Sequence, residues 1–444
     1  MQYENLPQEL VDRCLGKGAD SAEVLVEDGR QLSIEVRNGE METIQESSSH
    51  GAGFRVFREG KMGFSHSNDL SDASLNQAIE SAVNFAAHMT ADEHNVLPSD
   101  TGATEVDGLY DGGMGSVSMD DKIAMITRLE ELAMADSRIT VSNGASYGEG
   151  EGSVFLANST GLAKSYRASS CGYGVSVVAE KGDQKSSGGE SCSRRFFSDL
   201  VTPEEIAEKA ARSAYEMLDP QMVRTQRAPV IFDPDVARSL LGGILGAING
   251  ERVLQGASFL ADSVGQKISS ELLTIVDDGT LPKGLASSPF DGEGVPTQRR
   301  TIVDQGVLQG FMYNTMVASR AGVESTGNAA RGGFSSLPGI GPHAFYVEAG
   351  ETDPEEIIRS TPNGLYLKGV TGYGINPVSG DFSGGAQGFW IENGRLTFPV
   401  MGLTIAASAD EMLNGIDMLG NDLDLNRSMT APTFRIREMQ IGGM

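Results

Sequence analysis

The sequence predicts an α+β protein with two N-terminal α+β pieces, which form one lobe, and a β-rich C-terminal domain. A pattern of helix, strands and helix occurs twice before residue 220. Beyond Glu271 the chain consists mainly of short strand-like segments separated by turns. We therefore expect domains at residues 1–105, 115–222 and 226–444, with the last forming a barrel or a curved sheet that carries one packed helix.

The first piece begins with a helix at Pro7–Leu15, which the following glycines end. A second helix, Ser71–Met89, has its apolar residues on one face, and the Asp-, Gly- and Pro-rich stretch 92–114 is typical of a linker. Alternating apolar residues predict strands between these helices, joined by two-residue turns that tolerate positive φ. The expected strands are Ala22–Glu27, Gln31–Arg37, Glu40–Gln45, Gly51–Phe57 and Lys61–His66, with turns at Asp28-Gly29, Asn38-Gly39 and Glu59-Gly60.

The second piece begins with a helix from Ser118 to Ala135, where Ser118 and Asp121 form a capping box. It ends with a helix that Thr202 and Pro203 open and that runs to Met217. The expected strands between these helices are Ile139–Tyr147, Gly152–Asn158, Tyr166–Val178 and Lys185–Ser193.

The third piece opens with a strand at Ala228–Phe232 and a helix that begins at Asp233-Pro234 and contains the stretch Leu240–Leu254. Glycine at a helix interior costs about 1 kcal/mol relative to alanine, so the glycines of this stretch need a separate explanation. Either another segment packs very close to the helix, or these positions have lost side chains that had a function. The glycines are Gly242, Gly243, Gly246 and Gly250. The expected later elements are strands at Leu272–Asp277, Arg299–Asp304, Val307–Tyr313, Ala344–Ala349, Gly364–Gly374, Gly388–Glu392, Arg395–Val400 and Thr433–Gln440, and a helix at Ala409–Leu419.

Composition and charge exclude several classes of function. The formal net charge of −27 repels phosphate backbones and anionic lipid surfaces, so we expect neither a nucleic-acid partner nor a membrane partner. The N-terminal residues lack the pattern of a signal peptide, and no apolar run is long enough to span a bilayer. The odd number of cysteines, three, and the absence of a CxxC pair argue against a disulfide framework. We expect a cytoplasmic protein.

The sequence offers few candidates for catalytic or metal-binding residues. Of the five histidines, only His343 lies in the C-terminal half, in a Gly-Pro-His loop, where a structural role is commoner than catalysis. Cys171 and Cys192 fall in expected strands and are typical of buried, unreactive thiols. Acidic pairs such as Asp277-Asp278 and Asp291/Glu293 are typical of solvated turns, with a divalent-cation site as the alternative.

The stretch Gly380–Trp390 combines glycines with three aromatic residues. It suggests either a backbone-exposed surface that receives an extended peptide by strand addition, or a tight barrel corner with Phe382 and Trp390 buried. The residues that we expect at a candidate peptide or partner surface are Asn249, His343, Gly380, Asp381, Phe382, Gly384 and Trp390.

The whole chain resembles the TldD/PmbA family. The resemblance rests on FDGEGVPTQRRTIVDQGVLQGFMYN from Phe290, STGNAARGGF from Ser325, NPVSGDFSGGAQGFWIENGRLTFPV from Asn376 and MLGNDLDL from Met418. It implies two N-terminal α+β pieces, a β-rich C-terminal domain, and an association with a metalloprotease that acts on small, poorly folded peptides and proteins.

The family has two branches that resemble each other and assemble together. In the TldD branch an H-E-x-x-x-H helix and a cysteine near the C-terminus bind zinc, and the glutamate is the general base. The resemblance aligns the two histidines with Gly242 and Ala247 and the glutamate with Gly243, while residues 426–430 contain no cysteine. It therefore implies the PmbA (TldE) branch, with no catalytic residue, metal ligand or cofactor in this chain and with zinc in a TldD-like partner.

The sequence thus predicts a subunit of a TldD/TldE-type metalloprotease that takes part in peptide maturation and proteolysis. A TldD-like subunit in a heterodimer, or a second copy in a homodimer, is the expected partner, and a peptide is the expected substrate. Two alternatives remain. One is a self-sufficient peptidase that uses His343 with Asp381 or Glu293, and the other is a homodimeric peptide-binding module.

Overall fold

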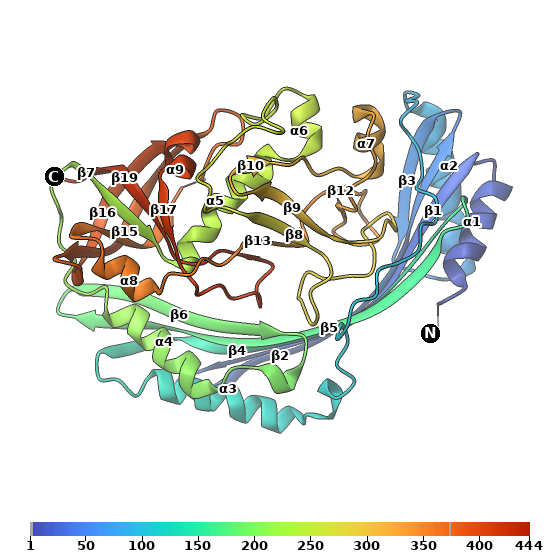
Figure 1. Cartoon of the computed structure of the whole chain (residues 1–444). Helices are drawn as coiled ribbons and strands as arrows, with labels where there is room; N and C mark the ends of the chain where they lie inside the picture. Colours follow the sequence, from blue (N-terminus) through green and yellow to red (C-terminus); the bar gives the residue numbers. More distant parts are fainter. Residues whose placement is uncertain (1–2, 373) are drawn as a thin grey trace.

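The computed structural model describes residues 3–372 and 374–444. One long, strongly curved antiparallel sheet forms the N-terminal half, and the C-terminal domain lies in its concavity (Figure 1). The strand order is β3-β2-β1-β4-β5-β6. The strands are β1 (Ser21–Arg37), β2 (Glu40–Arg58), β3 (Lys61–Ser67), β4 (Ile139–Asn158), β5 (Ala163–Lys181) and β6 (Gln184–Arg194).

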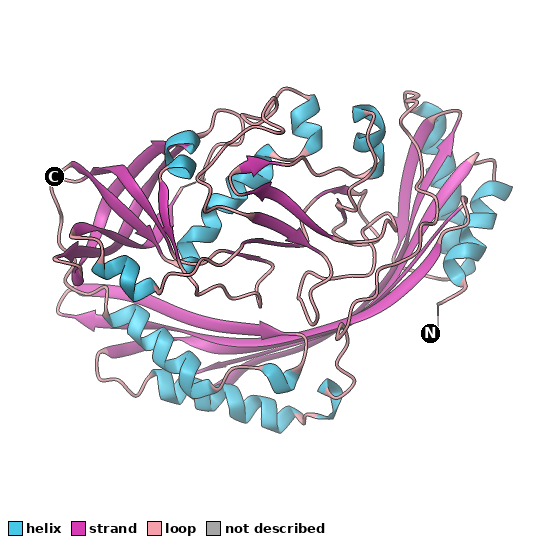
Figure 2. Ribbon diagram, viewed as in Figure 1, coloured by secondary structure: helices cyan, strands magenta, loops and turns pink. Residues whose placement is uncertain are grey.

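Two pairs of helices cover the convex face of this sheet, one pair toward each end (Figure 2). Helices α1 (Leu6–Gly16) and α2 (Asp72–His88) bury a core that includes Leu10, Ile79 and Phe54. Helices α3 (Met119–Ala133) and α4 (Pro203–Tyr215) bury a second core over the other end. The two α+β pieces therefore share one half-barrel sheet, because β1 pairs with β4 along most of its length.

The expected turn at Asp28-Gly29 is wrong. β1 runs through it, with Asp28 opposite His50 of β2 and Ser153 of β4. Strand neighbours on both sides satisfy the backbone there, so a turn would break two ladders at once. For the same reason the expected gap between Tyr147 and Gly152 is absent, and β4 is one strand. The turns at Asn38-Gly39 and Glu59-Gly60 are confirmed, with positive φ at all four residues.

The C-terminal domain contains a closed five-stranded barrel and a second five-stranded sheet. In the barrel β16, β15, β14, β7 and β19 follow one another, and pairing of β16 with β19 closes the ring, while β17 lies beside β19. These strands are β7 (Gln226–Phe232), β14 (Asn363–Thr371), β15 (Asp381–Glu392), β16 (Arg395–Ser408), β17 (Ile416–Leu419) and β19 (Phe434–Gly442). The second sheet has the order β10-β9-β8-β13-β18, with strands β8 (Ile275–Asp278), β9 (Arg299–Asp304), β10 (Val307–Leu308), β13 (Ala344–Val347) and β18 (Met429–Thr430).

Helix α5 (Pro234–Ala247) contacts both C-terminal sheets and belongs to their common core. The expected single helix through Leu254 is wrong. The chain breaks at Ile248-Asn249, and a short helix α6 (Gly250–Leu254) follows. The Asn249 side chain caps it by accepting from the amides of Glu251 and Arg252.

Several small elements, β18 among them, were not predicted, and some predictions were too long. The expected strand Val307–Tyr313 is only β10 (Val307–Leu308). The expected helix Ala409–Leu419 is α9 (Ala409–Asn414) followed by β17. The unpredicted elements are α7 (Thr315–Ala321), α8 (Pro354–Arg359), the two-residue strands β11 (Ala329–Ala330) and β12 (Gly339–Ile340), and the 3₁₀ turns Met114–Ser116 and Phe197–Asp199.

Candidate functional site

The glycines of α5 and α6 have two different surroundings. A side-chain carbon at Gly243 would lie 2.5 Å from Ile375 Cβ and 2.6 Å from the Ile375 carbonyl oxygen. At Gly246 the same atom would lie 2.9 Å from Pro377 Cβ, and at Gly250 it would lie 2.3 Å from the Tyr313 ring. Close packing therefore explains these three glycines. Gly242 is the exception, because nothing lies within 4 Å of its added carbon.

Gly242 faces a groove of about 860 Å³ that runs between α5 and the edge of the N-terminal sheet. The segment that the resemblance aligns with the third metal ligand lines the same groove, through Asn426, Arg427, Ser428 and Met429. The structure thus brings the two regions of the expected metal site together, although they are far apart in sequence.

The residues at this place do not fit a zinc ion. Gly242, Gly243 and Ala247 offer no ligating side chain, and residues 426–430 contain none with sulfur except Met429. Ile375 fills the space that a glutamate at position 243 needs. Among residues 3–372 and 374–444, no group of three or more His, Cys, Asp or Glu side chains is placed to hold a metal. We therefore derive no catalytic step through zinc in this chain.

The three cysteines are free and buried. Burial raises the pKa of the Cys14 thiol, and likewise that of Cys171, to about 12. A thiol of that pKa is neutral near pH 7, as is typical of a buried, unreactive cysteine.

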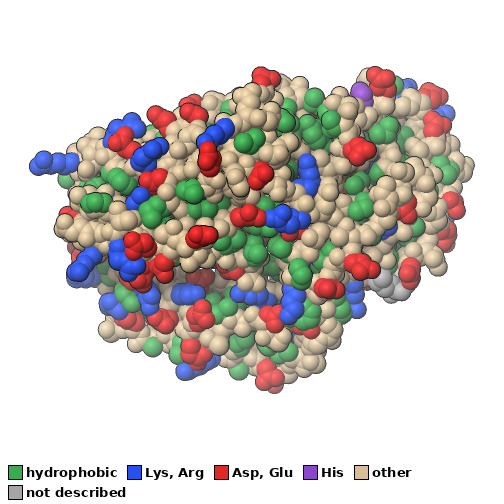
Figure 3. All heavy atoms as spheres, in the orientation of Figure 1, with side chains coloured by type: hydrophobic (Ala, Val, Ile, Leu, Met, Phe, Trp, Pro, Cys, Tyr) green, Lys and Arg blue, Asp and Glu red, His purple; other side chains and the backbone are tan. Residues whose placement is uncertain are grey.

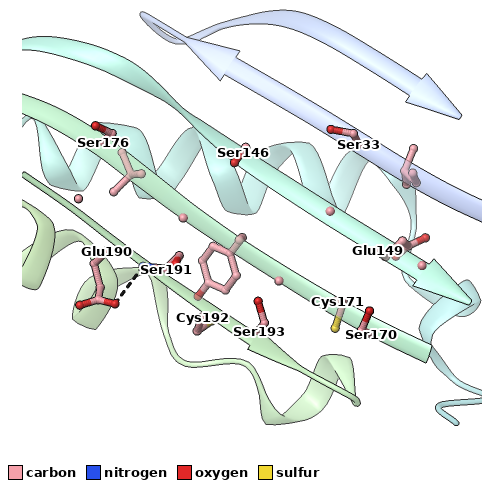
Figure 4. Close-up of a pocket in the computed structure, with 18 of the residues that line it drawn as sticks. Ser33, Ser146, Glu149, Ser170, Cys171, Ser176, Glu190, Ser191, Cys192 and Ser193 are labelled. Atoms are coloured by element: carbon pink, nitrogen blue, oxygen red, sulfur yellow. Dashed lines mark hydrogen bonds between the residues drawn. The ribbon is translucent and has the colours of Figure 1, made fainter. Parts of the chain in front are cut away.

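The concave face of the sheet is polar and has small side chains. Alternation along the strands turns Cys171, Tyr173 and Val175 toward the helices. The residues between them face a cavity of about 1050 Å³, where Figure 4 shows the serines of several neighbouring strands. The lining on this face consists of Gln31, Ser33, Gln45, Ser47, Gly144, Ser146, Gly148, Gly150, Ser170, Gly172, Gly174, Ser176, Gly189, Ser191 and Ser193.

This cavity is continuous with the groove beside α5. Ser191 and Ser193 of β6 line both spaces, as do Arg238 of α5 and Arg427. Arg427 pairs with Asp235 of α5 at 2.5 Å. One polar space therefore extends from the middle of the half-barrel to Gly242.

His343 lies just before β13 and is held by Asp277. Its amide donates to Asp277 Oδ1 (2.7 Å), and its Nδ1 lies 3.4 Å from Asp277 Oδ2. The carboxylates that the sequence suggested as its partners have other contacts: Glu293 pairs with Arg55 at 2.8 Å, and Asp381 begins β15 on the barrel and is exposed. His343 faces a separate cavity of about 210 Å³.

The stretch Gly380–Trp390 is a barrel strand and not an open docking edge. β15 pairs with β14 on one side and with β16 on the other, so its backbone has no free edge for strand addition. Phe382 is 2% exposed and Trp390 is 6% exposed, which places both rings in the barrel core. Gly384 packs against Thr371, where an added carbon would lie 2.8 Å from the carbonyl oxygen. Gly380 has a φ of 78° and ends the preceding loop.

Sequence reasoning missed a buried ion cluster between the two halves of the molecule. Arg55 of β2 binds Glu23 of β1 through two nitrogens, at 2.7 and 3.2 Å, and reaches Glu293 of the C-terminal domain at 2.8 Å. Arg331 also pairs with Glu23. All four side chains are 5% exposed or less. The sequence carried no signal for the pairs between the two halves, because Glu293 lies about 240 positions from Arg55 and Arg331 lies about 310 positions from Glu23.

The acidic pair Asp291/Glu293 is buried, contrary to the solvated turn that we expected. Burial, together with the neighbouring Glu293 charge, raises the pKa of Asp291 to about 7. Its oxygens accept hydrogen bonds from the amides of Glu293, Val295 and Ala329. Both carboxyl groups thus hold the loop that joins the domains.

Comparisons with known proteins identify the family and agree with the fold. Residues 22–86, 114–218 and 225–443 match family models described as PmbA/TldA metallopeptidase domain 1, central domain and C-terminal domain. The chain is 32% identical to Metalloprotease PmbA of Escherichia coli O157:H7, over 96% of this chain and 93% of that protein. It is 31% identical to a Metalloprotease PmbA homolog of Haemophilus influenzae, over 96% and 93%.

Solved structures of related proteins have the same fold over nearly the whole chain. A Bacteroides thetaiotaomicron protein, described as a candidate modulator of DNA gyrase, matches with a TM-score of 0.92 and 28% identity over 100% of this chain and 99% of that chain. TldE from Thermococcus kodakarensis matches with a TM-score of 0.89 and 25% identity over 98% and 99%. No helix in the described residues is long and apolar enough to cross a membrane.

Proposed function

The chain belongs to the PmbA/TldD metallopeptidase family, and we propose that it is the subunit without a metal site in a two-subunit peptidase. Its partner is a TldD-like subunit that carries the zinc and the general base. The observation that carries the proposal is α5, where Gly242, Gly243 and Ala247 occupy the ligand and base positions and Ile375 packs on Gly243. The tight packing of Ile375 on Gly243 supports the proposal, because a glutamate side chain would not fit at this position.

The role of this chain is to form part of the wall of a cavity that admits small or unfolded peptides. The concave sheet face supports this role, because its serine, glycine and glutamine residues give the cavity a polar lining of small groups, to which Glu149, Glu190, Asp235, Arg238 and Arg427 add charges of both signs. An extended peptide of almost any sequence can replace its hydrogen bonds to water by hydrogen bonds to such a lining. A folded protein would not enter, because the C-terminal domain already occupies the concavity.

A free strand edge supports assembly with a partner. β2 pairs with β3 only from Ala52 onward, and every residue from Glu40 to His50 is exposed. In the described structure this stretch has β1 on one side and no strand on the other. Long exposed edges invite pairing with another chain, and Met41 and Ile44 add exposed apolar groups at this edge.

The test mixes the purified chain with its TldD-like partner and measures complex formation by light scattering and cleavage of an unstructured peptide. We expect a complex and faster cleavage than the partner gives alone. If the partner cleaves equally well alone and no complex forms, the proposal fails.

The same preparations test the two alternatives. Peptide cleavage by this chain alone that disappears in His343→Ala would favour a self-sufficient peptidase. A stable homodimer that retains peptide and ignores the partner would favour a peptide-binding module. Direct action on DNA gyrase's DNA substrate is disfavoured, because a net charge of −27 repels phosphates.

A further inference from the structure

A smaller cavity, of about 530 Å³, lies on the concave face of the N-terminal sheet, away from α5. It adjoins the large polar cavity, since Gln31 and Ser170 line both, but it shares no residue with the groove beside α5. Three polar side chains whose charges or hydrogen bonds are not fully satisfied line this cavity. They are Glu27 of β1, Tyr166 of β5 and Arg195, which directly follows β6.

The strand register forms the floor of this cavity. Glu27, Val154 and Tyr166 lie in one row across three neighbouring strands, because Val154 pairs with both of the others. Neighbouring strands lie about 4.8 Å apart, so the backbones that carry Glu27 and Tyr166 are about 10 Å apart. The next row on the same face has almost no side chains and leaves the space above it open. It consists of Gly29, Gly152 and Ala168.

Arg195 is a buried cation without a carboxylate partner. The residue is 8% exposed, and its guanidinium donates to the carbonyl oxygens of four residues at 2.8 to 3.1 Å. Two other buried cations, Arg55 and Lys122, each pair with a carboxylate at 2.7 Å. Carbonyl groups satisfy hydrogen bonds but carry no net charge. Burial lowers the pKa of Arg195, with Tyr166 opposing this, whereas an ion pair would raise the pKa.

Glu27 is an anion without a paired cation in the same cavity. Its Oε2 accepts from the Phe334 amide at 2.8 Å, whereas its Oε1 has no hydrogen bond within the part of the chain that the structure describes. Burial raises the pKa of the Glu27 carboxyl, and the Phe334 amide and the Arg331 charge offset this only in part. Arg331 forms its ion pair with Glu23 instead.

Charges on the outer surface need no such partners. Figure 3 shows acidic and basic side chains interspersed there, where water screens them. Glu27 and Arg195 line an internal cavity, and Tyr166 lies between them in the order of the strands. Burial and the Glu27 charge raise the pKa of Tyr166, and the Arg195 charge opposes this. The cavity thus holds a carboxylate, a guanidinium and a hydroxyl, each with capacity left for a ligand.

We propose that this cavity binds a short peptide of two or three residues with both ends free, and that it holds the ligand by its charged ends. The N-terminal ammonium donates to Glu27. The C-terminal carboxylate accepts from the Tyr166 hydroxyl and from the Nη1 N–H of Arg195 that the four carbonyls leave free. Two or three extended residues span about 7 to 11 Å, which matches the width of two strand spacings.

A zwitterion fits the cavity better than a simple ion. A lone anion would leave Glu27 without a cation, and a lone cation would leave Arg195 without an anion, whereas a peptide with free ends supplies both charges at once. The site lies within this chain and needs no partner subunit, so it goes beyond the proposed function. Short peptides with free ends are also what a peptidase releases, and only this link to products rests on the proposed function.

Isothermal titration calorimetry of the whole chain with dialanine tests the site. N-acetyl-dialanine lacks the ammonium, and dialanine amide lacks the carboxylate. We expect dialanine to bind and each capped form to bind at least about tenfold more weakly, because a cap leaves one charge of the cavity without a partner. Alanine should also bind more weakly, because both of its charged groups are attached to one carbon.

Variants of the chain locate the site. Glu27→Gln keeps an acceptor for the Phe334 amide but removes the charge. It should weaken dialanine about tenfold and leave N-acetyl-dialanine unchanged, because the cap and the variant remove the same interaction. Tyr166→Phe keeps the ring contact with Phe290 and should weaken dialanine about threefold. Glu35→Gln is the matched control with unchanged affinity, since Glu35 is exposed on the same strand but does not line the cavity.

Four results would overturn the inference: no binding of dialanine, equal binding of dialanine and its capped forms, alanine binding as tightly as dialanine, or equal weakening of dialanine and N-acetyl-dialanine by Glu27→Gln. The last would mean that the variant disturbs the structure and not the ammonium contact. Each leaves the proposed function standing if the partner still cleaves peptide faster with this chain than alone. Failure of that acceleration, with dialanine still bound, would instead remove the proposed function.

Discussion

Two glycines of α5, Gly242 and Gly243, show how the surroundings of a position decide whether a side chain fits there. Gly243 and Gly242 are neighbours in one helix, yet the first is buried against Ile375 and the second is exposed to the groove. Helix propensity alone would make alanine better than glycine by about 1 kcal/mol at both positions. Packing, and not helix propensity, therefore distinguishes Gly243 from Gly242.

Gly243→Ala should destabilise the protein, because the new methyl group would lie 2.5 Å from Ile375 Cβ. We expect a loss of about 1 to 3 kcal/mol in the free energy of unfolding, as for other overpacked cores. Gly242→Ala is the matched control and should be neutral or stabilising by up to about 1 kcal/mol. Urea unfolding followed by circular dichroism measures both. Equal effects at the two positions would show that the Ile375 contact is not what excludes a side chain.

Asp291 should make stability depend on pH. Its folded pKa of about 7 lies well above the ordinary aspartate value of about 4. A group with a raised folded pKa contributes stability that is fully present below its unfolded pKa and is lost as pH rises through the folded pKa. The contribution of Asp291 should therefore fall between about pH 4 and pH 7, by on the order of 4 kcal/mol at most.

Asp291→Asn removes the titration, so the difference in unfolding free energy between wild type and variant should change across this pH range. Urea titrations at pH 5, 6, 7 and 8 measure it, with the exposed Glu46→Gln as control. Parallel pH profiles for wild type and Asp291→Asn would contradict the prediction.

At the scale of elements, the sequence predicted the four N-terminal helices well and the long strands poorly. The ends of α1, α2, α3 and α4 follow from local signals, such as the Ser118 side chain that accepts from the Asp121 amide at 3.1 Å. Asp28-Gly29 has the composition of a turn, but β2 and β4 hold both edges of β1 there. The β4 partner of Asp28 lies more than a hundred positions away in sequence, and no local pattern contains it.

The candidate site was predicted only in part, because some of its contacts join residues that are far apart in sequence. The residues that the resemblance aligns with metal ligands on α5 could be named from the sequence, because they lie within one helical segment. The groove that joins Gly242 to β6, and the Asp277 partner of His343, depend on tertiary packing. Phe382 and Trp390 carry the composition of a binding surface, yet closure of the barrel buries them.

At the scale of the whole molecule, buried ion pairs fix the C-terminal domain within the half-barrel. The Arg55 guanidinium joins Glu23 of the sheet to Glu293 of the C-terminal domain. Arg195 adds hydrogen bonds from the sheet side to the carbonyls of Gly284, Leu285 and Ser287. The cavity wall and the groove therefore keep a fixed separation.

Arg55→Met should cost about 3 to 5 kcal/mol, because it leaves Glu293 buried without its cation. The matched control is Arg30→Met. Arg30 pairs with Glu46 on the same sheet, but both side chains are more than half exposed, so the cost should stay below about 1 kcal/mol. Denaturant unfolding measures the two values. A small effect for Arg55→Met would mean that the Arg55 ion pairs are not what holds the domains together.

The free edge of β2 is the part of the molecule on which assembly with the partner depends. If the partner pairs along Glu40–His50, a charge at Ile44 should weaken the complex without lowering stability, because Ile44 is already 42% exposed. We expect Ile44→Lys to raise the dissociation constant for the TldD-like subunit at least about tenfold. Val141→Lys is the matched control, since Val141 is 41% exposed on β4 of the same sheet, where it pairs with Val178 of β5 and lies outside the free stretch of β2. Light scattering and hydrogen exchange of the complex measure the outcome, with protection expected at the β2 amides. Equal weakening by both variants would point to a general effect of charge, and no weakening by either would place the interface elsewhere.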